Sequence, residues 1–306
     1  MAPVIELRGV HKFFPGVHAL REVDFEIEAG EVHALVGENG AGKSTLIKII
    51  AGAYSLDEGQ LEVEGVPTVL FHPRQAQDLG LVVVHQELEL VPSLSVAENI
   101  FFGRLPNQKG RVLWKKLHAD ARILLDQVGL AVDPKTQVGY LGIAAQQLVE
   151  IARALSQQAK LIVMDEPTSA LSPQEIDRLL LLIDQLRSRG VSVLYVSHKL
   201  EEVLRISNRV TVLRDGAKVA CQQTAELDEK SLVELMVGRE LGLGFPDVNR
   251  SAKSVALQVQ NLTTDSVNNI SFEVHEGEIV GFSGLMGAGR TELAQALIWV
   301  DRRRGG

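Results

Sequence analysis

The chain has 306 residues, of which 45% are hydrophobic and 23% are charged, and these proportions are typical of globular proteins rather than disordered or fibrous ones. Its 39 acidic and 31 basic residues give a net charge of −8, which argues against a general nucleic-acid-binding surface. A single cysteine, Cys221, excludes an internal disulfide, and because no run of about 18 uncharged apolar residues is present, we expect any role at a membrane to require a partner protein.

Short strands and helices alternate along the predicted chain. Alternating apolar residues predict half-buried strands at 5–8, 23–28 and 61–63. Continuous apolar runs predict buried strands at 32–36, 80–84, 161–165, 191–197 and 210–213. Helical periodicity begins after Lys43 and recurs at about 144–156, 173–189 and 199–206. This alternation predicts an α/β fold with a mostly parallel sheet.

An internal repeat divides the chain. Residues 23–32 reappear in pattern at 270–279, and each copy predicts two strands joined by a Gly-Glu turn, followed by a glycine-rich loop and a helix. The copies lie too far apart for a solenoid, so the repeat indicates duplication of a whole domain. We therefore expect a first domain at 1–240, a linker at 241–254 and the opening part of a second domain at 255–306.

The first glycine-rich loop carries the clearest functional signal. It lies between an apolar strand and a helix, and it matches G-x-x-x-x-G-K-[ST] in full. Glycines let the backbone approach a phosphate closely, and the amide groups at a helix N-terminus favour anions. We expect Lys43 to reach the β- and γ-phosphates and the Ser44 hydroxyl to bind Mg²⁺. The predicted nucleotide-binding residues are Gly37, Glu38, Asn39, Gly40, Ala41, Gly42, Lys43, Ser44 and Thr45.

Two carboxylates close another apolar run. Asp165 and Glu166 stand at the end of the predicted strand 161–165, which places them at the carboxyl edge of a parallel sheet, where α/β proteins bind their ligands. Asp165 suits contact with Mg²⁺, and Glu166 suits polarisation of an attacking water. An apolar strand followed by Asp-Glu is common by itself, and its combination with the glycine loop makes the pattern specific.

Five blocks in this order resemble the ATP-binding-cassette (ABC) family. They cover about residues 4–238 and comprise the glycine loop, Val82–Glu87, Gln146–Leu155, Asp165–Leu171 and Tyr195–Leu200. Phe14–Leu20 and the second loop, Gly284–Glu292, are similar to the fused tandem ATPases of ribose, galactose, xylose and arabinose importers. The resemblance implies an α/β P-loop NTPase fold with a mostly parallel core sheet, an antiparallel β subdomain and a helical subdomain at about 87–159.

The resemblance also implies roles for residues near the phosphates. It assigns Glu166, His198 and Gln86 to catalysis, with His198 contacting the γ-phosphate. It assigns Ser44, Gln86 and Asp165 to Mg²⁺, because the loop that carries Gln86 senses the metal and the attacking water. ATP and Mg²⁺ are therefore the expected ligands.

Two further segments take roles from the resemblance. Phe14 is expected to stack on adenine, and its neighbour Phe13 is an equally placed alternative. Residues 169–172 are expected to face an opposing cassette.

Two departures from the family pattern stand out. The signature loop, usually Leu-Ser-Gly-Gly-Gln, is Leu141–Ala145 here, with Gly142 in place of the serine and Ala144 in place of a glycine. In the second glycine loop Arg290 replaces the phosphate-binding lysine, and no aromatic residue stands between 262 and 272. If cassettes pair head to tail, the signature loop of one cassette faces the glycine loop of the other. Both departures then fall on the same nucleotide site, which predicts one competent and one silent site in the complete protein.

The sequence thus predicts an ATPase subunit that powers monosaccharide import. The expected partners are a membrane permease, a second cassette and, indirectly, an external sugar-binding protein, with the chain on the cytoplasmic face of the membrane. A soluble ABC ATPase acting on ribosomes or nucleic acid is the alternative, and the net charge of −8 counts against it. A third hypothesis is a truncated ATP-binding module without turnover.

Overall fold

A computed structural model of the protein describes residues 2–238, 254–284 and 287–306. The chain divides into two compact units, Met1–Leu241 and Gly242–Gly306, and each is described by itself. Except for Ser254, the predicted linker lies outside the described residues. Within the described ranges, each helix is too short or too polar to cross a bilayer.

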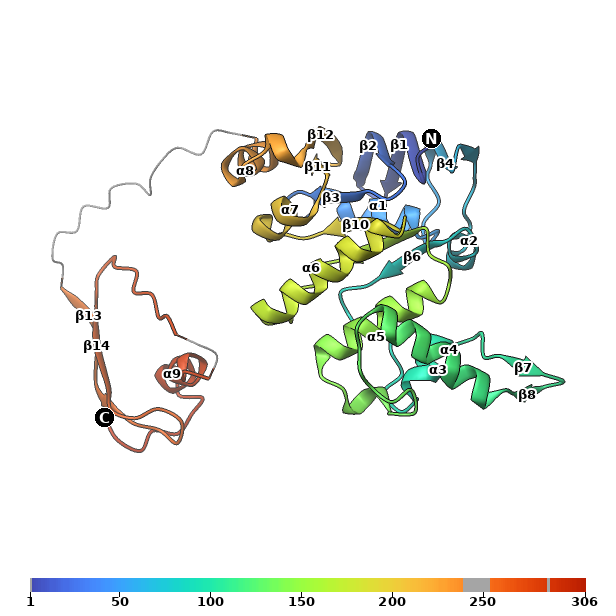
Figure 1. The fold of residues 1–306 in the computed structure, drawn as a ribbon. Helices are drawn as coiled ribbons and strands as arrows, with labels where there is room; N and C mark the ends of the chain where they lie inside the picture. The colour runs from blue at the N-terminus through green and yellow to red at the C-terminus, as the bar shows by residue number, and fades with distance from the viewer. Residues whose placement is uncertain (1, 239–253, 285–286) are drawn as a thin grey trace. The chain divides into compact units, whose positions relative to one another are not determined.

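The first unit is built around a six-stranded sheet (Figure 1). Its strands run in the order β12–β11–β3–β10–β9–β6, and neighbouring strands are parallel except β11 and β12. Their bounds are Val32–Val36 for β3, Leu81–Val84 for β6, Leu161–Asp165 for β9, Ser192–Val196 for β10, Arg209–Arg214 for β11 and Ala217–Gln223 for β12. All five predicted buried strands are present, and the predicted α/β fold with a mostly parallel sheet is confirmed.

A second, antiparallel sheet contains the predicted half-buried strands. Its order is β2–β1–β4–β5, and its bounds are Ile5–Phe14 for β1, Val17–Ile27 for β2, Glu58–Val63 for β4 and Val66–Pro67 for β5. β1 and β2 are longer than the alternation predicts. The pairing of β1 with β2 shifts between Leu7 and Val10 and again before Lys12 and Phe13, and each shift interrupts the two-residue periodicity.

Eight α-helices belong to the described part of the first unit. They are α1 Lys43–Ile50, α2 Pro73–Asp78, α3 Val96–Ile100, α4 Trp114–Gln127, α5 Ile143–Leu155, α6 Pro173–Ser188, α7 Leu200–Ile206 and α8 Glu229–Val237. Helices α3, α4 and α5 pack on one another, beside a short hairpin of β7 (Asn107–Gln108) and β8 (Arg111–Val112). Helix α6 begins as predicted, because the Glu175 carboxylate accepts hydrogen bonds from the Ser172 amide and hydroxyl and Pro173 occupies the first turn.

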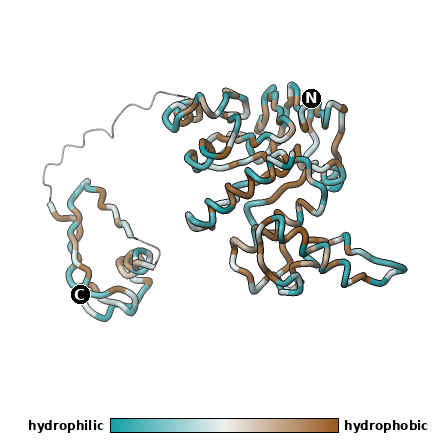
Figure 2. Tube along the Cα trace, viewed as in Figure 1, coloured by the Kyte–Doolittle hydropathy of each residue, from teal (hydrophilic) through white to brown (hydrophobic). Residues whose placement is uncertain are grey.

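Each face of the six-stranded sheet covers a separate hydrophobic core. In β9, Ile162 and Met164 belong to one core, whereas Leu161 and Val163 belong to the other. Burial on both faces explains why these strands appear as continuous apolar runs in the sequence. Along the helices, hydrophobic and hydrophilic stretches alternate, as expected for helices with one buried face (Figure 2).

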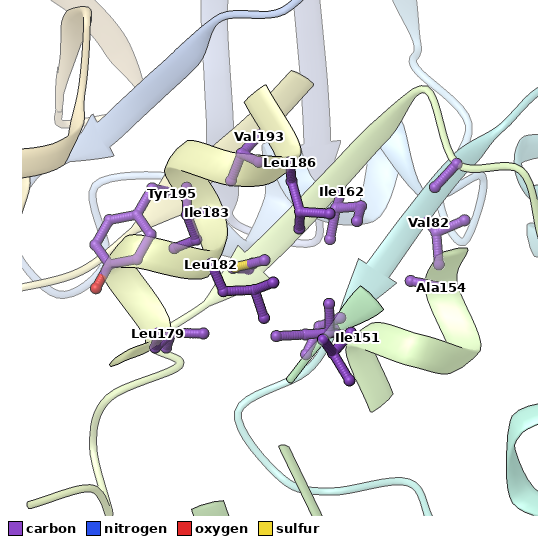
Figure 3. Close-up of a cluster of buried hydrophobic side chains, with 14 of the residues drawn as sticks. Val82, Ile151, Ala154, Ile162, Leu179, Leu182, Ile183, Leu186, Val193 and Tyr195 are labelled. Atoms are coloured by element: carbon purple, nitrogen blue, oxygen red, sulfur yellow. The ribbon is translucent and has the colours of Figure 1, made fainter. Parts of the chain in front are cut away.

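The first of these cores joins the sheet to helices α5 and α6 (Figure 3). Leu186 of α6 lies beside Ile162 of β9, and Ala154 of α5 lies beside Val82 of β6. Tyr195 of β10 is completely buried in the same core. Helix α5 is thereby fixed against the strand from which the Gln86 loop departs.

The second unit contains β13 (Val255–Leu262), β14 (Ile270–His275) and α9 (Arg290–Leu297) around a small core. The prediction of another strand from Ile279 onward is wrong, since residues 279–284 are not in a strand and Ile279 is 98% exposed. In the first unit, the corresponding β3 is held between β10 and β11. The described residues of the second unit provide no such neighbours, so an apolar run alone does not form a strand there.

The Gly-Glu turn has the same geometry in both units. In the first, the Glu28 amide donates to the Glu31 carboxylate over 2.7 Å, and in the second the His275 amide donates to the Glu278 carboxylate over 2.7 Å. The preceding glycines have φ angles of 68° and 70°. The sequence repeat therefore corresponds to a repeat of local structure.

Glu31, directly before β3, also contacts two strands of the six-stranded sheet. Its carboxylate accepts hydrogen bonds from Arg209 over 2.7 Å and lies 3.0 Å from Nδ1 of the buried His33. Burial raises the pKa of Glu31, but the contacts with His33 and Arg209 outweigh this effect and lower it to about 2.

We expect Glu31→Gln to lower the free energy of unfolding at pH 7 by about 2–3 kcal/mol, because it leaves Arg209 without its most buried partner. The folded-state pKa lies below the unfolded value, so this stabilisation is present above about pH 4.3 and is lost as the pH falls toward 2. Urea unfolding at several pH values measures the difference. Glu26→Gln, which removes the more exposed contact with Arg209, should cost less than about 1 kcal/mol, and equal losses would contradict the assignment.

Candidate nucleotide-binding site

Four neighbouring parallel strands end at one edge of the sheet and position the predicted site. β3 leads into the glycine loop, β10 into His198, β9 into Asp165 and Glu166, and β6 into Gln86. Val196 lies opposite Asp165 in the register, and the Glu166 amide donates to the Val196 carbonyl over 2.8 Å. The sheet therefore brings together segments that are far apart in the sequence.

Steric contacts explain two glycines of the loop. Gly37, Gly40 and Gly42 have φ angles of 155°, 85° and 104°. A Cβ atom on Gly37 would overlap the carbonyl oxygen of Leu213, and one on Gly42 would lie 2.8 Å from the carbonyl oxygen of Ala19. Nothing lies within 4 Å of the corresponding position at Gly40, so Gly40 is favoured by its backbone angle alone.

Helix α1 begins directly at the lysine of the loop. Lys43 Nζ donates to the carbonyl oxygens of Gly37, over 2.7 Å, and Glu38, over 3.0 Å. Burial lowers the pKa of Lys43, while the charges of Glu166 and Asp165 oppose that shift. The ammonium group therefore lies over the loop and within the field of both carboxylates.

The remaining residues of the loop differ in exposure. Ala41 is buried and packs in the core, whereas Asn39 and Ser44 are exposed and Thr45 is half-buried. Ser44 follows Lys43 in the first turn of α1, where helix amides favour an anion.

Glu166 is the centre of the polar contacts at the strand ends. Gln86 Nε2 donates to Oε2 of Glu166 over 3.3 Å, and His198 Nδ1 lies 3.1 Å from Oε1. The Glu166 side chain is 25% exposed and its φ angle is 48°, in the left-handed region that side chains rarely adopt. All three residues that the sequence assigned to catalysis thus meet at one carboxylate.

Asp165 is half-buried and directly precedes Glu166. Burial and the neighbouring Glu166 charge raise the pKa of Asp165, while His85, Lys43 and Lys48 lower it. A bound cation would relieve the repulsion between these two carboxylates. The oxygen donors of Ser44, Gln86 and Asp165 are of the type that Mg²⁺ prefers, so the residues present fit this ion.

The two candidate adenine-stacking residues have different surroundings. The Phe13 ring is 46% exposed and stacks on His18, with ring centroids 4.2 Å apart. Phe14 is half-buried, its ring contacts Tyr54 edge-on at 5.4 Å, and Lys12 Nζ lies 5.6 Å from its centroid. Each ring therefore has a neighbouring group over one face.

A buried polar network beneath His198 was missed by the sequence reasoning. The Glu202 carboxylate accepts hydrogen bonds from Thr168 and Tyr195, each over 2.7 Å, and lies 3.2 Å from Lys199 Nζ. Lys199 also donates to the Thr168 carbonyl over 3.1 Å. This network joins the segment after Glu166 to the segment after His198. Three of its members, Thr168, Tyr195 and Lys199, lie in the blocks Asp165–Leu171 and Tyr195–Leu200, and Glu202 lies outside them.

The unusual signature loop belongs to the helical region. Gly142 is the N-cap residue of α5, and its backbone is extended, with a φ of −66° that any residue can adopt. The replacement of serine by Gly142 is therefore not required by the local backbone.

The chain is similar to known proteins in sequence and in fold. Residues 20–169 match the family described as ABC transporter. The chain is 46% identical over 299 residues to a ribose import ATP-binding protein of Streptomyces avermitilis, with 97% of this chain and 57% of the relative covered. It is 47% identical over 305 residues to a putative ribose/galactose/methyl galactoside import ATP-binding protein of Burkholderia cenocepacia, with 98% and 59% covered. The chain thus spans less than two thirds of the length of these relatives.

Solved structures show the same fold. An ATP-binding cassette of an ABC transporter in its ADP conformation is 26% identical, with a TM-score of 0.68, and the alignment covers 78% of this chain and 100% of the cassette. A dimeric cassette bound to ADP and phosphate is 25% identical, with a TM-score of 0.61, and 72% and 98% are covered. The segment 20–169 thus belongs to the ABC transporter family, and its fold and its glycine loop are those of an ATP-binding cassette.

Proposed function

We propose that the chain is an ATP-binding and ATP-hydrolysing subunit that powers monosaccharide import through an ABC membrane transporter. The observation that carries the proposal is the meeting of the glycine loop, Asp165, Glu166, Gln86 and His198 at one edge of the sheet. The relatives named for ribose and galactose import support a monosaccharide as the cargo.

In this proposal, the residues at the strand ends divide the work of hydrolysis. The amides of residues 37–45 and the Lys43 ammonium bind the phosphates. Glu166 accepts a proton from the attacking water, and His198 contacts the γ-phosphate. Ser44, Gln86 and Asp165 would hold Mg²⁺, which neutralises phosphate charge when bound.

We propose that adenine stacks on Phe14, with Phe13 as the alternative. Both rings stand at the end of β1, where His18 stacks on the Phe13 ring and Lys12 Nζ lies over the Phe14 ring. A base on an aromatic ring contributes about 1–3 kcal/mol in nucleic-acid complexes, so stacking on either ring has energetic weight here.

We further propose that the second unit is the opening part of a second, degenerate cassette. Its Gly-Glu turn repeats the geometry of the first, and Gly289 precedes α9 with a φ of 82°, as Gly42 precedes α1 with a φ of 104°. Arg290 takes the place of Lys43. By this proposal residues 1–240 form a complete cassette, with about 87–159 as its helical subdomain. The first glycine loop would then face the signature loop of a second cassette.

The proposed partners follow from this role. The chain docks on a membrane permease at the cytoplasmic face, and an external sugar-binding protein delivers the cargo to that permease. Co-purification tests this directly: permease subunits should accompany the chain from detergent-solubilised membranes. Recovery of ribosomal RNA in their place would favour the alternative of a soluble ABC ATPase.

We expect Lys43→Ala to weaken Mg·ATP binding by at least about 100-fold, because charged hydrogen bonds to phosphate oxygens contribute roughly 3 kcal/mol. The matched variant Arg290→Ala should change the affinity by less than about twofold, since its loop is not expected to bind nucleotide. Isothermal titration calorimetry measures both, and equal losses would contradict the asymmetry between the two loops.

We expect the chain alone to hydrolyse ATP slowly, and Glu166→Gln to reduce that rate by about 100-fold or more because the general base is lost. Mg·ATP affinity should stay within about twofold, since the glutamine keeps the shape of the side chain. Single-turnover assays with labelled ATP measure the rate, with Glu201→Gln on the exposed surface of α7 as the control. An unchanged rate in Glu166→Gln would refute its role as the base.

A further inference from the structure

The loop after β6 is fixed to helix α5 at a single residue. Glu150 of α5 accepts a hydrogen bond from the Glu89 amide over 2.6 Å, and Arg153, one turn later, donates to the Glu89 carbonyl over 3.0 Å. Both backbone polar groups of Glu89 are therefore bound by side chains of α5.

The same loop connects the helical region to the proposed catalytic carboxylate. Val91 lies two residues beyond Glu89. The Asn99 side chain accepts a hydrogen bond from the Val91 amide over 2.8 Å and donates one to the Val91 carbonyl over 3.1 Å. Three residues before Glu89, Gln86 contacts Glu166. The position of Gln86 thus depends on a short segment whose other end is held by α3 and α5.

Glu150 is an unusual anchor because it is buried and only partly satisfied. It is 6% exposed, and within the described part of the chain Oε2 of Glu150 and Oε1 of Gln157 have no hydrogen-bond partner. Both residues line a cavity of about 180 Å³. The charged or titratable groups that line the same cavity are Lys48 of α1, His85 and Glu89 of the loop, and Arg153 of α5.

These surroundings make the ionisation of Glu150 sensitive to pH near neutrality. Burial raises its pKa to about 7 against the opposing effects of the Glu89 amide and Arg153, and the Glu89 charge adds to the rise. An ionised carboxylate accepts a stronger hydrogen bond than a neutral carboxyl group. The bond to Glu89 should therefore tighten as the pH rises through about 7 and loosen as it falls.

We propose that Glu150 is a positioning residue for the ATP site, which holds the Gln86 loop on α5 when ionised and loosens it when protonated. This role rests on the proposed ATPase function. Glu150 acts through the Glu89 backbone and Gln86, and it has no direct contact with Glu166 among the hydrogen bonds of the described residues.

The loop anchor can be tested without nucleotide. In the full chain labelled with ¹⁵N, the Glu89 amide resonance should titrate with a midpoint near pH 7. Glu150→Gln, which keeps the side-chain shape and removes the charge, should abolish this step. His85→Gln should retain it, and this control is needed because the His85 imidazole lines the same cavity. A step that persists in Glu150→Gln, or disappears in His85→Gln, would overturn the proposal.

The rate of ATP hydrolysis then tests whether the contact between Glu150 and Glu89 affects the catalytic site. Glu150→Gln should lower the single-turnover rate of Mg·ATP hydrolysis about fivefold at pH 8 and much less at pH 6, where the wild-type carboxyl is largely neutral. The KM for ATP should be unchanged, and the exposed variant Glu226→Gln should match wild type at both pH values. Equal rates for Glu150→Gln and wild type at pH 8 would overturn the positioning role. Absence of ATP binding in wild type would instead refute the proposed function, while the resonance titration would still decide the anchor.

Discussion

The parallel register of β3, β10, β9 and β6 is the constraint on which the site depends. Because neighbouring parallel strands end at the same edge, the glycine loop, His198, the two carboxylates and Gln86 converge without any local sequence signal that joins them. The bond from the Glu166 amide to the Val196 carbonyl extends the register by one residue beyond the strands. The proposed catalytic groups are therefore placed by the sheet, and the loops add only short extensions.

Charge balance at this edge favours an anion paired with a cation. Lys43 lies over the loop carbonyls, and the repulsion between Asp165 and Glu166 is relieved only in part by Lys43, Lys48 and His85. Mg·ATP, the proposed ligand, would bring both kinds of charge together and so complement the lysine and the carboxylates at the same time. The contact of Gln86 with Glu166 also depends on the helical region, because Glu150 of α5 binds the Glu89 amide three residues after Gln86.

Much of this arrangement was predictable from the sequence, because buried parallel strands leave continuous apolar runs and the P-loop has a strict spacing. β1 and β2 were predicted too short because irregular pairing breaks their alternation. The strand expected at Ile279 does not form, since a strand needs neighbours that a local pattern does not reveal. Glu150 lay inside a recognised block, yet its contact with Glu89 spans 61 residues and depends on how α5 packs on β6.

In the proposed function, nucleotide and metal bind together at the carboxyl ends of β3 and β9. Paramagnetic broadening by Mn²⁺·ATP, with Mn²⁺ in place of Mg²⁺, tests it most directly in the ¹⁵N-labelled chain. The amide signals of Gly42, Ser44, Gln86 and Asp165 should disappear first, while those of Gly289 and Arg290 should remain sharp. Broadening centred on Gly289 and Arg290, or no selective broadening at all, would contradict it.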